Sequence, residues 1–311
     1  MKVCFEKWHG CKNDFIVVWL NANEQQVFDS LRRQAPKLCR RDGGAIGADG
    51  ILVLHTQLIS DLLPNKLSII NSDGSLAANC GNGLRCCAGS ILKRHADNEK
   101  LRDLPEIVEL KVNDKLYMCQ YLTDELENVE VDKLPFISVD MGVPLTDNSV
   151  DWFNQAKDTL KKFDIIKDIH VCEVGNQHIV LFNQNTSDKK VFYSVSSEIQ
   201  KAWAGGINIH FTEPVEAGPQ HQKQAAHDIG QSITEAYIAL PWERGVGPTN
   251  ACGSGACALA ACAFATGDAS RSDWIAIDMP GGRLYARQDD AEGPITLAGP
   301  AQLVFCGEFS F

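Results

Sequence analysis

The sequence has little positive charge and no long apolar run. Lys and Arg number 29 against 40 Asp and Glu, so the formal net charge is −11 at pH 7. We therefore expect neither nucleic acid nor a membrane surface as a partner. The best apolar run, Cys257–Ala265, is far shorter than the roughly 20 residues that cross a bilayer. The first residues contain no apolar core of signal-peptide length, and we expect a cytosolic, cytoplasmic protein.

The sequence also lacks the motifs of metal and cofactor sites. None of its 12 cysteines forms a C-x-x-C pair, the spacing typical of zinc sites. A chain of 311 residues is not a small disulfide-built domain. It carries neither a Schiff-base lysine motif nor the phosphate loop G-x-x-x-x-G-K-S/T. We predict that it uses no metal and no cofactor.

Two short stretches of the sequence are near copies of each other, Asn79–Cys86 and Ala251–Cys257. In each, a cysteine (Cys80 or Cys252) directly precedes a G-x-G turn, and an apolar, helix-like segment follows. The glycines permit a tight turn whose backbone N–H groups point outward. A thiol at such a helix start feels the positive end of the helix dipole, which favours the thiolate. Two activated thiols on matching turns predict one active site with a cysteine on each side.

The two halves of the chain repeat one order of elements around these stretches. We expect the helix after Cys80 to end near His95, and the helix after Cys252 to end near Thr266 with Gly267 as its cap. The expected strands are Val3–Trp8, Phe15–Trp19, Ile51–His55, Leu67–Asn71, Ile107–Val112 and Lys115–Cys119, then Val174–Phe182, Gly205–Phe211, Ala236–Trp242, Trp274–Met279 and Arg283–Arg287. The repeat predicts an internal duplication into two homologous domains.

Four segments fall outside this repeat. Thr123–Asp132 is acidic and is expected at the surface, and Asp147–Asp168 is expected to be a polar linker with an amphipathic helix around Trp152–Phe163. Pro214–Ser232 is interpreted as a surface insertion. Ile295–Phe311 is interpreted as a strand pair that packs back onto the first domain.

Two thiols that face one ligand from opposite sides suit a proton transfer that inverts a stereocentre. One thiol, as the thiolate, removes a proton from carbon, and the other delivers a proton to the opposite face. The N–H groups of the two glycine turns can bind the substrate carboxylate and stabilise the charge that builds there. These residues therefore favour a cofactor-free inversion at carbon.

With these motifs the sequence resembles the diaminopimelate epimerase family, whose members are cofactor-independent amino-acid epimerases with two catalytic cysteines. The resemblance covers nearly the whole chain, and its short motifs are specific because they occur together and in order. They are His9-Gly10, Asn13-Asp14-Phe15, Gly47-Ala48-Asp49-Gly50, Asn71-Ser72-Asp73-Gly74-Ser75, Cys80-Gly81-Asn82-Gly83, Gly175-Asn176 with His178, Asn208, Glu243-Arg244-Gly245, Ala251-Cys252-Gly253-Ser254-Gly255 and Pro280-Gly281-Gly282.

The resemblance implies a role for each matched residue. Cys80 and Cys252 are implied as the catalytic bases, assisted by His178 and Glu243. The substrate carboxylate at the reacting centre is implied to bind the backbone N–H groups of Gly81, Asn82, Gly253 and Ser254. The rest of the substrate is implied to be recognised by Asn13, Asn71, Asn176, Asn208, Glu243 and Arg244. This set makes chemical sense, because arginine suits a carboxylate and Glu with Asn suits an ammonium group.

The resemblance also implies a fold and a reaction. The expected fold is α+β, with two homologous domains that are each a curved, mostly antiparallel, barrel-like sheet around a central helix. We predict an N-terminal epimerase domain at 1–134 plus 298–311, a C-terminal one at 135–297, and the active site in the interdomain cleft. The implied reaction interconverts L,L-2,6-diaminopimelate and the meso isomer, in lysine and peptidoglycan precursor biosynthesis. A homodimer is the family expectation.

Five positions depart from the usual family pattern. Lys12 replaces a glycine, Gln177 a proline, Pro248 a glutamate and Leu84 a small residue, and Gly50 stands where some members have glutamine. None of these departures removes a residue assigned to the chemistry. Lys12 and Pro248 bear on the pocket entrance, and therefore on the substrate and the rate.

Three alternatives stay open. The same mechanism could act on another amino acid such as histidine, although the retained distal residues argue against that, and Asn82 stands where proline racemases carry a histidine. The protein could be a non-epimerase relative of the same fold, although such relatives need not keep both cysteines. A redox-sensing pair is partly compatible, because we expect Cys80 and Cys252 to form a disulfide on oxidation.

Overall fold

The chain divides into two compact units. The computed structural model describes residues 2–77, 79–123, 135–147, 150–152, 154, 158, 160–161 and 168–311. Unit 1 comprises Met1–Val139 with Gly299–Phe311, and unit 2 comprises Asp140–Ala298. The boundaries predicted from the sequence lie at 134 and 297. The acidic segment from residue 124 onward, and most of the helix predicted around Trp152–Phe163, lie outside the described residues.

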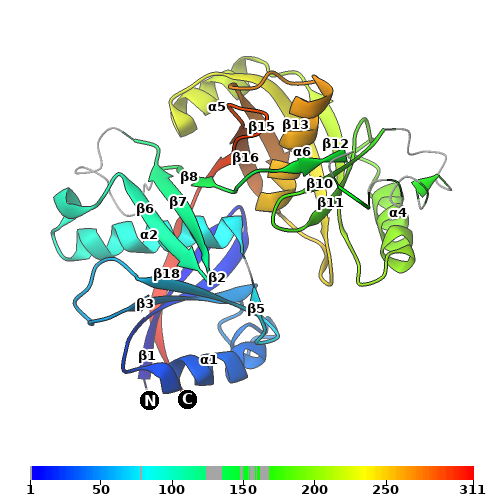
Figure 1. Cartoon of the computed structure of the whole chain (residues 1–311). Coiled ribbons are helices and arrows are strands. Elements are labelled where there is room, and N and C mark those ends of the chain that lie inside the picture. Colours follow the sequence, from blue (N-terminus) through cyan, green and yellow to red (C-terminus); the bar gives the residue numbers. More distant parts are fainter. Residues whose placement is uncertain are drawn as a thin grey trace. The chain divides into compact units, whose positions relative to one another are not determined.

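The strands of unit 1 form a sheet beside helix α2 (Figure 1), and two of its strand pairs are parallel. Its strands are β1 (Lys2–Gly10), β2 (Asn13–Asn21), β3 (Gly50–Thr56), β4 (Lys66–Asn71), β5 (Leu76–Ala77), β6 (Ile107–Val112), β7 (Lys115–Tyr121), β8 (Ile137–Asp140) and β18 (Gln302–Ser310). They pair in the order β18-β1-β2-β3-β4-β6-β7-β8, with β5 also on β4. The pairs β2–β3 and β4–β6 are parallel, and the other pairs in this order are antiparallel.

Helix α2 (Gly81–Asp97) is the centre of unit 1. All its residues from Gly81 to Leu92 are buried, and it contacts β1, β2, β3, β7 and β18. Because these strands extend from β18, at one end of the pairing order, to β7, next to the other end, the sheet curves around the helix, as predicted. Gly89 permits the close approach of β1, since a β-carbon there would lie 2.7 Å from the ring of Trp8. Helix α1 (Gln25–Leu38) buries Val27, Leu31 and Ala35 on the side that contacts β3 and β4.

Unit 2 repeats the topology of unit 1. Its strands are β9 (Leu145–Thr146), β10 (Ile169–Glu173), β11 (Gln177–Leu181), β12 (Asn208–Val215), β13 (Ile233–Glu243), β14 (Gly247–Pro248), β15 (Trp274–Met279), β16 (Gly282–Arg287) and β17 (Thr296–Gly299). They pair in the order β9-β10-β11-β12-β13-β15-β16-β17, with β14 also on β13. The parallel pairs β11–β12 and β13–β15 occupy the places of β2–β3 and β4–β6. The predicted duplication is thus visible in the strand pairing.

Helix α6 (Gly253–Thr266) is the counterpart of α2. Ala, Cys, Leu and Phe side chains surround its axis, and it contacts β9, β10, β11, β12 and β16. The predicted end at Thr266 is confirmed, because Gly267 follows in the left-handed region with φ 86°. Both central helices begin directly after a cysteine, so each unit presents one cysteine at the N-terminus of its buried helix.

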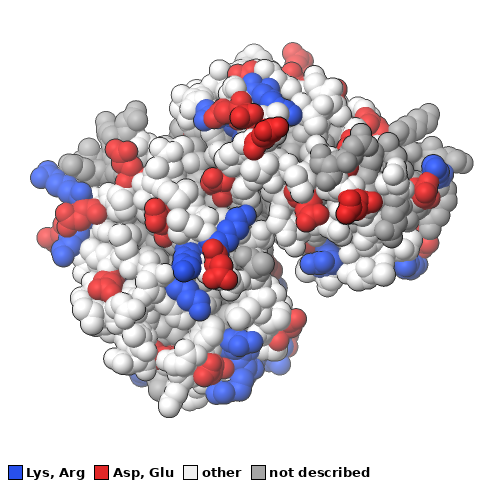
Figure 2. All heavy atoms as spheres, viewed as in Figure 1, with Lys and Arg blue, Asp and Glu red and all other residues white. Residues whose placement is uncertain are grey.

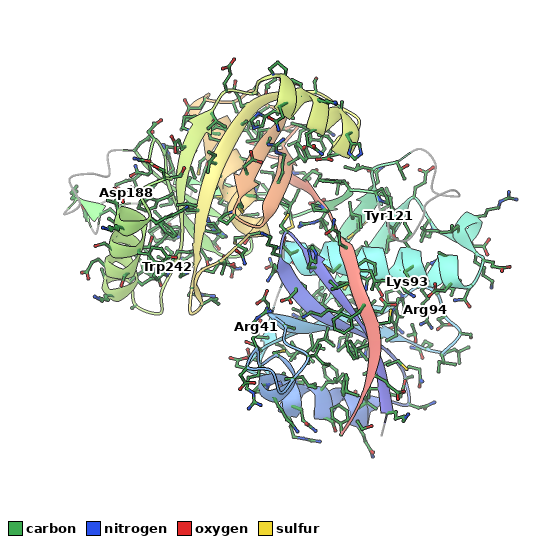
Figure 3. The ribbon with its side chains drawn as sticks, turned by 180° about the vertical axis from the view of Figure 1, so that it is seen from behind. Arg41, Lys93, Arg94, Tyr121, Asp188 and Trp242 are labelled. Atoms are coloured by element: carbon green, nitrogen blue, oxygen red, sulfur yellow. The ribbon has the colours of Figure 1, made fainter. Side chains whose placement is uncertain are left out.

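Three polar-faced helices were missed by the sequence analysis: α1, α4 (Lys189–Ala202) and α5 (Pro219–Ile229). As predicted, Pro214–Ser232 interrupts the repeat at the surface: it contains α5, whereas no helix lies between the corresponding strands β3 and β4. The helix itself was not foreseen; it buries Ala225 and Ile229, and its Asp228 accepts a hydrogen bond from Tyr285 at 2.8 Å. Trp242 packs beside α4, against the ring of Phe192 (Figure 3). In the last segment β17 joins the unit 2 sheet, whereas β18 pairs with β1 in unit 1.

The surface carries both charge signs. On the face drawn in Figure 2, basic side chains are interspersed with acidic ones over both units. Among the described residues, none of the helices has the length and apolar character that crossing a membrane requires.

Candidate active site

Cys80 caps the N-terminus of α2 in unit 1. Its backbone is extended (φ −162°, ψ 104°), and its carbonyl accepts the first helical hydrogen bond from Leu84 N–H at 2.8 Å. The Gly83 N–H donates to Cys80 Sγ at 3.4 Å. An N–H donor and the helix dipole both favour negative charge at this sulfur. The thiol is half-buried rather than sealed in the core.

Asn13 and Asn82 lie together with Cys80. Asn13 Oδ1 is 4.0 Å from Cys80 Sγ and accepts a hydrogen bond from Asn82 Nδ2 at 3.1 Å. On its other side Asn13 Nδ2 donates to Asp49 Oδ2 at 2.7 Å. The structure therefore brings three predicted site residues of unit 1 into contact, and adds Asp49 to them.

Asn71 lies at the end of β4, opposite Gly50 on β3. Its side chain is exposed and donates to Ser75 Oγ at 2.9 Å across the turn that precedes the Cys80 segment. Gly50 is required by the packing of these strands, because a β-carbon there would lie 2.7 Å from the carbonyl oxygen of Ile70. A glutamine, which some family members have, would not fit this backbone without a shift.

Cys252 caps the N-terminus of α6 in unit 2 with the same backbone conformation. Its dihedral angles are φ −133° and ψ 109°, and its carbonyl accepts from Ala256 N–H at 2.9 Å. Its Sγ lies 3.6 Å from Ser254 Oγ. Burial, and after it the charge of Glu243, raises the pKa of the Cys252 thiol well above its ordinary value. The helix dipole favours the thiolate at both helix starts, but at Cys252 desolvation outweighs the dipole.

The remaining unit 2 residues of the predicted site line adjacent strand ends. Asn208, at the start of β12, donates from Nδ2 to Gln177 O at 3.0 Å and accepts from Arg244 N–H at 3.0 Å. Glu243 accepts from Thr249 Oγ1 at 2.7 Å, and the Arg244 side chain is exposed. Asn176 is half-buried in the turn before β11. Asn208 thus ties the β10–β11 turn to the Glu243-Arg244 segment.

His178 is fully buried and pairs with another histidine. Its Nδ1 lies 2.9 Å from His210 Nε2, while its Nε2 and His210 Nδ1 are buried without a hydrogen-bond partner in the described structure. Burial, then His210 and Arg244, lowers the pKa of His178 well below its ordinary value. Burial likewise lowers the pKa of His210 to about 3. Both rings are therefore neutral at physiological pH.

The sequence is similar to known proteins over nearly its whole length. The sequence model of the family described as Diaminopimelate epimerase matches residues 5–122 and 170–304. The chain belongs to the diaminopimelate epimerase family. It is 30% identical to the diaminopimelate epimerase of Desulforudis audaxviator, with 98% of each chain covered, and 31% identical to that of Prochlorococcus marinus strain NATL2A, with 99% of each covered.

Solved structures with the same fold come from several groups of proteins. A phenazine biosynthesis PhzF-family protein from Bacillus anthracis superimposes with a TM-score of 0.65 at 14% identity, covering all of both chains. A hydroxyproline epimerase from Agrobacterium vitis superimposes with a TM-score of 0.61 at 11% identity, covering 99% of this chain and 92% of that one. At these identities the likeness shows the α+β fold alone.

Three residues of this diaminopimelate epimerase family member were missed by the sequence analysis as parts of the site: Asp49, Arg85 and His210. Arg85 did carry a signal, because it is the one charged residue among the apolar positions that open α2. Asp49 lies in a quoted motif but had no assigned role. His210 carried no signal, since its pairing with His178 depends on the register between β11 and β12. Among the described residues, no group of three or more His, Cys, Asp or Glu is placed to hold a metal ion.

Proposed function

We propose that the protein is a cofactor-free diaminopimelate epimerase that interconverts L,L-2,6-diaminopimelate and meso-diaminopimelate with Cys80 and Cys252 as its two bases. The observation that carries the proposal is the repeated placement of a cysteine at the N-cap of each central helix. Membership of the family supports the substrate. We place this reaction in lysine and peptidoglycan precursor biosynthesis, in the cytoplasm.

In the proposed reaction the two thiols exchange roles in each turnover. One cysteine, as the thiolate, takes the α-proton and becomes a thiol, while the other thiol gives its proton to the opposite face and becomes the thiolate. The C–H bond broken and the C–H bond formed are at the same carbon, so no redox step occurs. The N–H groups of Gly81, Asn82, Gly253 and Ser254 would bind the carboxylate and stabilise the carbanionic charge.

We propose that the distal amino-acid end of the substrate is bound by Arg244 with Glu243 and the amides of Asn13, Asn71, Asn176 and Asn208. Arg244 is free to reach a carboxylate in solvent, because its side chain is exposed. The proximity of Glu243 to the Cys252 thiol means that the same carboxylate can also assist its proton transfer. His178 is neutral and buried, so it would assist Glu243 and Cys252 indirectly and would not act as a charged acid.

The test is proton exchange in deuterated water with reduced enzyme and L,L-diaminopimelate, followed by NMR and chiral separation. We expect deuterium at one α-carbon and appearance of the meso isomer. Cys80→Ala and Cys252→Ala should each lower the rate by roughly 10²- to 10⁴-fold. Cys306→Ala, which removes an exposed thiol on β18, is the matched control and should leave the rate unchanged.

Each other outcome has a definite meaning. Exchange with a different amino acid but not with diaminopimelate would support the two-thiol mechanism and show that the substrate is not diaminopimelate. No exchange with any amino acid would reject the enzymatic proposal.

We further propose that the protein forms a homodimer through β18. This strand pairs with β1, and no described strand pairs with its other edge. Its Val304 and Phe305 side chains are 53% and 45% exposed, which is typical of an edge that another chain covers. Val304→Asp should therefore shift the mass in light scattering from dimer to monomer. Leu116→Asp, at an equally exposed site on β7, should not. A monomeric wild-type protein would contradict the proposal.

A further inference from the structure

Arg85 is a buried cation that the proposed reaction leaves without a role. Its side chain is 0% exposed, and no carboxylate forms an ion pair with it in the described structure. It donates from Nη2 to Asn82 Oδ1 at 2.6 Å, from Nη1 to Gly81 O at 3.3 Å and from Nε to Pro300 O at 3.3 Å. A buried charge without a counter-ion costs free energy, and its retention in the first turns of α2 calls for a function.

The hydrogen bonds that start at Arg85 form a chain with a fixed direction. A guanidinium can only donate, so Asn82 must turn its Oδ1 toward Arg85 and its Nδ2 toward Asn13. At the other end an ionised carboxylate can only accept, so Asn13 must turn its Nδ2 toward Asp49. Both side-chain amides are therefore oriented from two sides, and Asn13 Oδ1 is left facing Cys80 Sγ.

The charged groups around the Asp49 end keep that carboxylate in place. Arg41 pairs with Asp49 at 2.7 Å and also with Asp14. Lys7 pairs with Asp14 at 2.8 Å. Although burial opposes ionisation of Asp14, hydrogen bonds from Arg41 and Lys7 lower its pKa. Figure 3 shows Arg41 in unit 1, on the loop that follows α1.

Cys80 thereby meets two opposed partners. The Asn13 carbonyl oxygen can accept from the S–H of the thiol, and the Gly83 N–H donates to the sulfur and favours the thiolate. A group that must be an acid in one direction and a base in the other needs both forms to be accessible. The equilibrium between the thiol and the thiolate of Cys80 then depends on the fixed orientation of Asn13 and on the positive charge of Arg85.

We propose that Arg85 is a positioning residue for Cys80: it orients Asn82 and Asn13 and sets the proton affinity of the thiol from beneath the cysteine turn. The proposal rests on the proposed role of Cys80 as a base. The Arg85 charge also acts on neighbouring thiols. Burial raises the pKa of Cys11, and raises that of Cys119 to about 12, while the Arg85 charge acts in the opposite direction at both.

The experiment measures alkylation of Cys80 and Cys252 by iodoacetamide as a function of pH, resolved by mass spectrometry, in the full-length protein. Arg85→Met should raise the pH midpoint of Cys80 alkylation by about one unit, because a nearby positive charge is lost. Arg85→Lys, which keeps the charge and one donor, should restore most of that shift. The Cys252 midpoint in the same samples should not move, because the hydrogen bonds that Arg85 makes in the described structure all lie within unit 1.

Arg94→Met is the matched control on the same helix. Arg94 donates to the carbonyls of Asp61 and Ile59 and stacks on Trp19. It therefore stabilises α2 but is not part of the hydrogen-bond chain that leads to Cys80. It lies further along α2, next to Lys93 (Figure 3). This variant should leave the Cys80 midpoint unchanged. In proton exchange, Arg85→Met should lower kcat by at least about tenfold, and Arg94→Met should not.

Asp49, at the other end of the hydrogen-bond chain, offers a second variant that does not disturb the core. Asp49→Asn removes a partly exposed negative charge beside Asn13 and weakens the pair with Arg41, and the loss of a negative charge favours the Cys80 thiolate. It should therefore lower the Cys80 midpoint, opposite in sign to Arg85→Met. If Arg85→Met does not fold, Arg85→Lys and Asp49→Asn carry the test.

An unchanged Cys80 midpoint in both end variants, or shifts of the same sign, would overturn the role of Arg85. Alkylation needs no substrate. A wild-type protein that fails to exchange diaminopimelate protons would therefore reject the proposed function, while the alkylation shifts would still decide the role of Arg85.

Discussion

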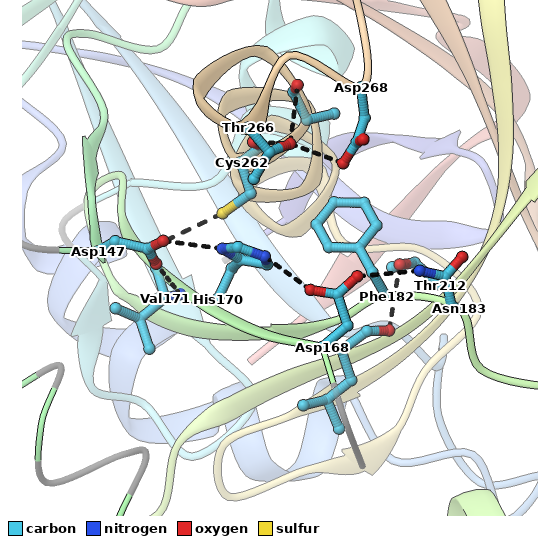
Figure 4. A network of polar contacts seen from close by, with 12 residues as sticks. Asp147, Asp168, His170, Val171, Phe182, Asn183, Thr212, Cys262, Thr266 and Asp268 are labelled. Atoms are coloured by element: carbon cyan, nitrogen blue, oxygen red, sulfur yellow. Dashed lines mark hydrogen bonds and ion pairs between the residues drawn. The ribbon is translucent and has the colours of Figure 1, made fainter.

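At the scale of single residues, unit 2 contains two histidine clusters with opposite electrostatics. His178 and His210 lie in an apolar interior that lowers their pKa values. His170 lies between two carboxylates, with Nδ1 2.8 Å from Asp147 and Nε2 2.9 Å from Asp168 (Figure 4). Burial opposes its protonation, but these two carboxylates outweigh burial and raise the pKa of His170. Each cluster makes a separate prediction.

The first prediction concerns pH and His170. A pKa that is raised in the folded state gives stability that is fully present below the unfolded value of about 6.5 and is lost as the pH rises through the folded value. His170→Gln should therefore destabilise the protein more at pH 5.5 than at pH 9, measured by urea unfolding. His227→Gln, whose side chain is 83% exposed, is the control. An equal cost of His170→Gln at both pH values would contradict the prediction.

The second prediction concerns the contact between His210 and Gly255 in the first turn of α6. A β-carbon at position 255 would lie 2.1 Å from His210 Cε1. Gly255→Ala should therefore destabilise unit 2 by about 1–3 kcal/mol through overpacking. In His210→Ala the same substitution should cost much less, because the ring is gone. Additive effects in this double-mutant cycle would show that the two residues do not meet.

At the scale of elements, the β1–β2 hairpin shows how a family departure is accommodated. The register Gly10↔Asn13 leaves Cys11 and Lys12 as a two-residue turn, and both have positive φ, 53° and 65°. Such turns favour Asn-Gly, because residues with a β-carbon are strained in the left-handed region. The glycine that the family resemblance implies at position 12 would be free of this strain. The turn delivers Asn13 to Cys80, so strain here lies next to the site.

The third prediction follows from this turn. Lys12→Gly should stabilise the protein by about 1 kcal/mol, since it removes the left-handed strain at an exposed position. Lys12→Ala keeps the β-carbon and should give no gain, which separates backbone strain from loss of charge. The measurement is the urea midpoint of unfolding for both variants. Equal stability of the two variants would rule out strain as the cause.

At the scale of the whole molecule, two copies of one topology each supply one thiol. The duplication repeats the parallel strand pairs, the central helix and the capping cysteine. The copies have diverged in electrostatics: Cys80 is half-buried with an N–H donor at its sulfur, while Cys252 is buried and its pKa is raised. A reaction that uses one thiol and one thiolate can exploit such a difference.

The fourth prediction tests the proposed meeting of the two thiols at one carbon. Mild oxidation with diamide should form a Cys80–Cys252 disulfide, abolish epimerisation, and be reversed by dithiothreitol. The disulfide is identified by mass spectrometry of the non-reduced digest. Cys80→Ala and Cys252→Ala should prevent this cross-link, and Cys306→Ala should not. Activity that survives stoichiometric oxidation would mean that the two thiols do not act together.

The sequence by itself determined the motif residues, the two central helices and most of the strands. Short strands with apolar repeats, G-x-G turns after Cys80 and Cys252, and the Gly267 cap are local signals. The structure places the two turns and the cap as expected, whereas the strand predicted at Val174–Phe182 begins only at Gln177. The amphipathic helices α1, α4 and α5 were missed because their polar faces hide the apolar periodicity in a linear reading.

Only the tertiary structure decided which polar groups meet. The contact of Asn13 with Cys80, the orienting hydrogen bonds of Arg85 and the pairing of His178 with His210 join residues on different elements or depend on register. The raised pKa of Cys252 was also decided there, because desolvation depends on how completely the unit closes over the thiol. The local sequence is enough to predict that a helix dipole acts on a cysteine. The burial that opposes the dipole is a property of the packed fold.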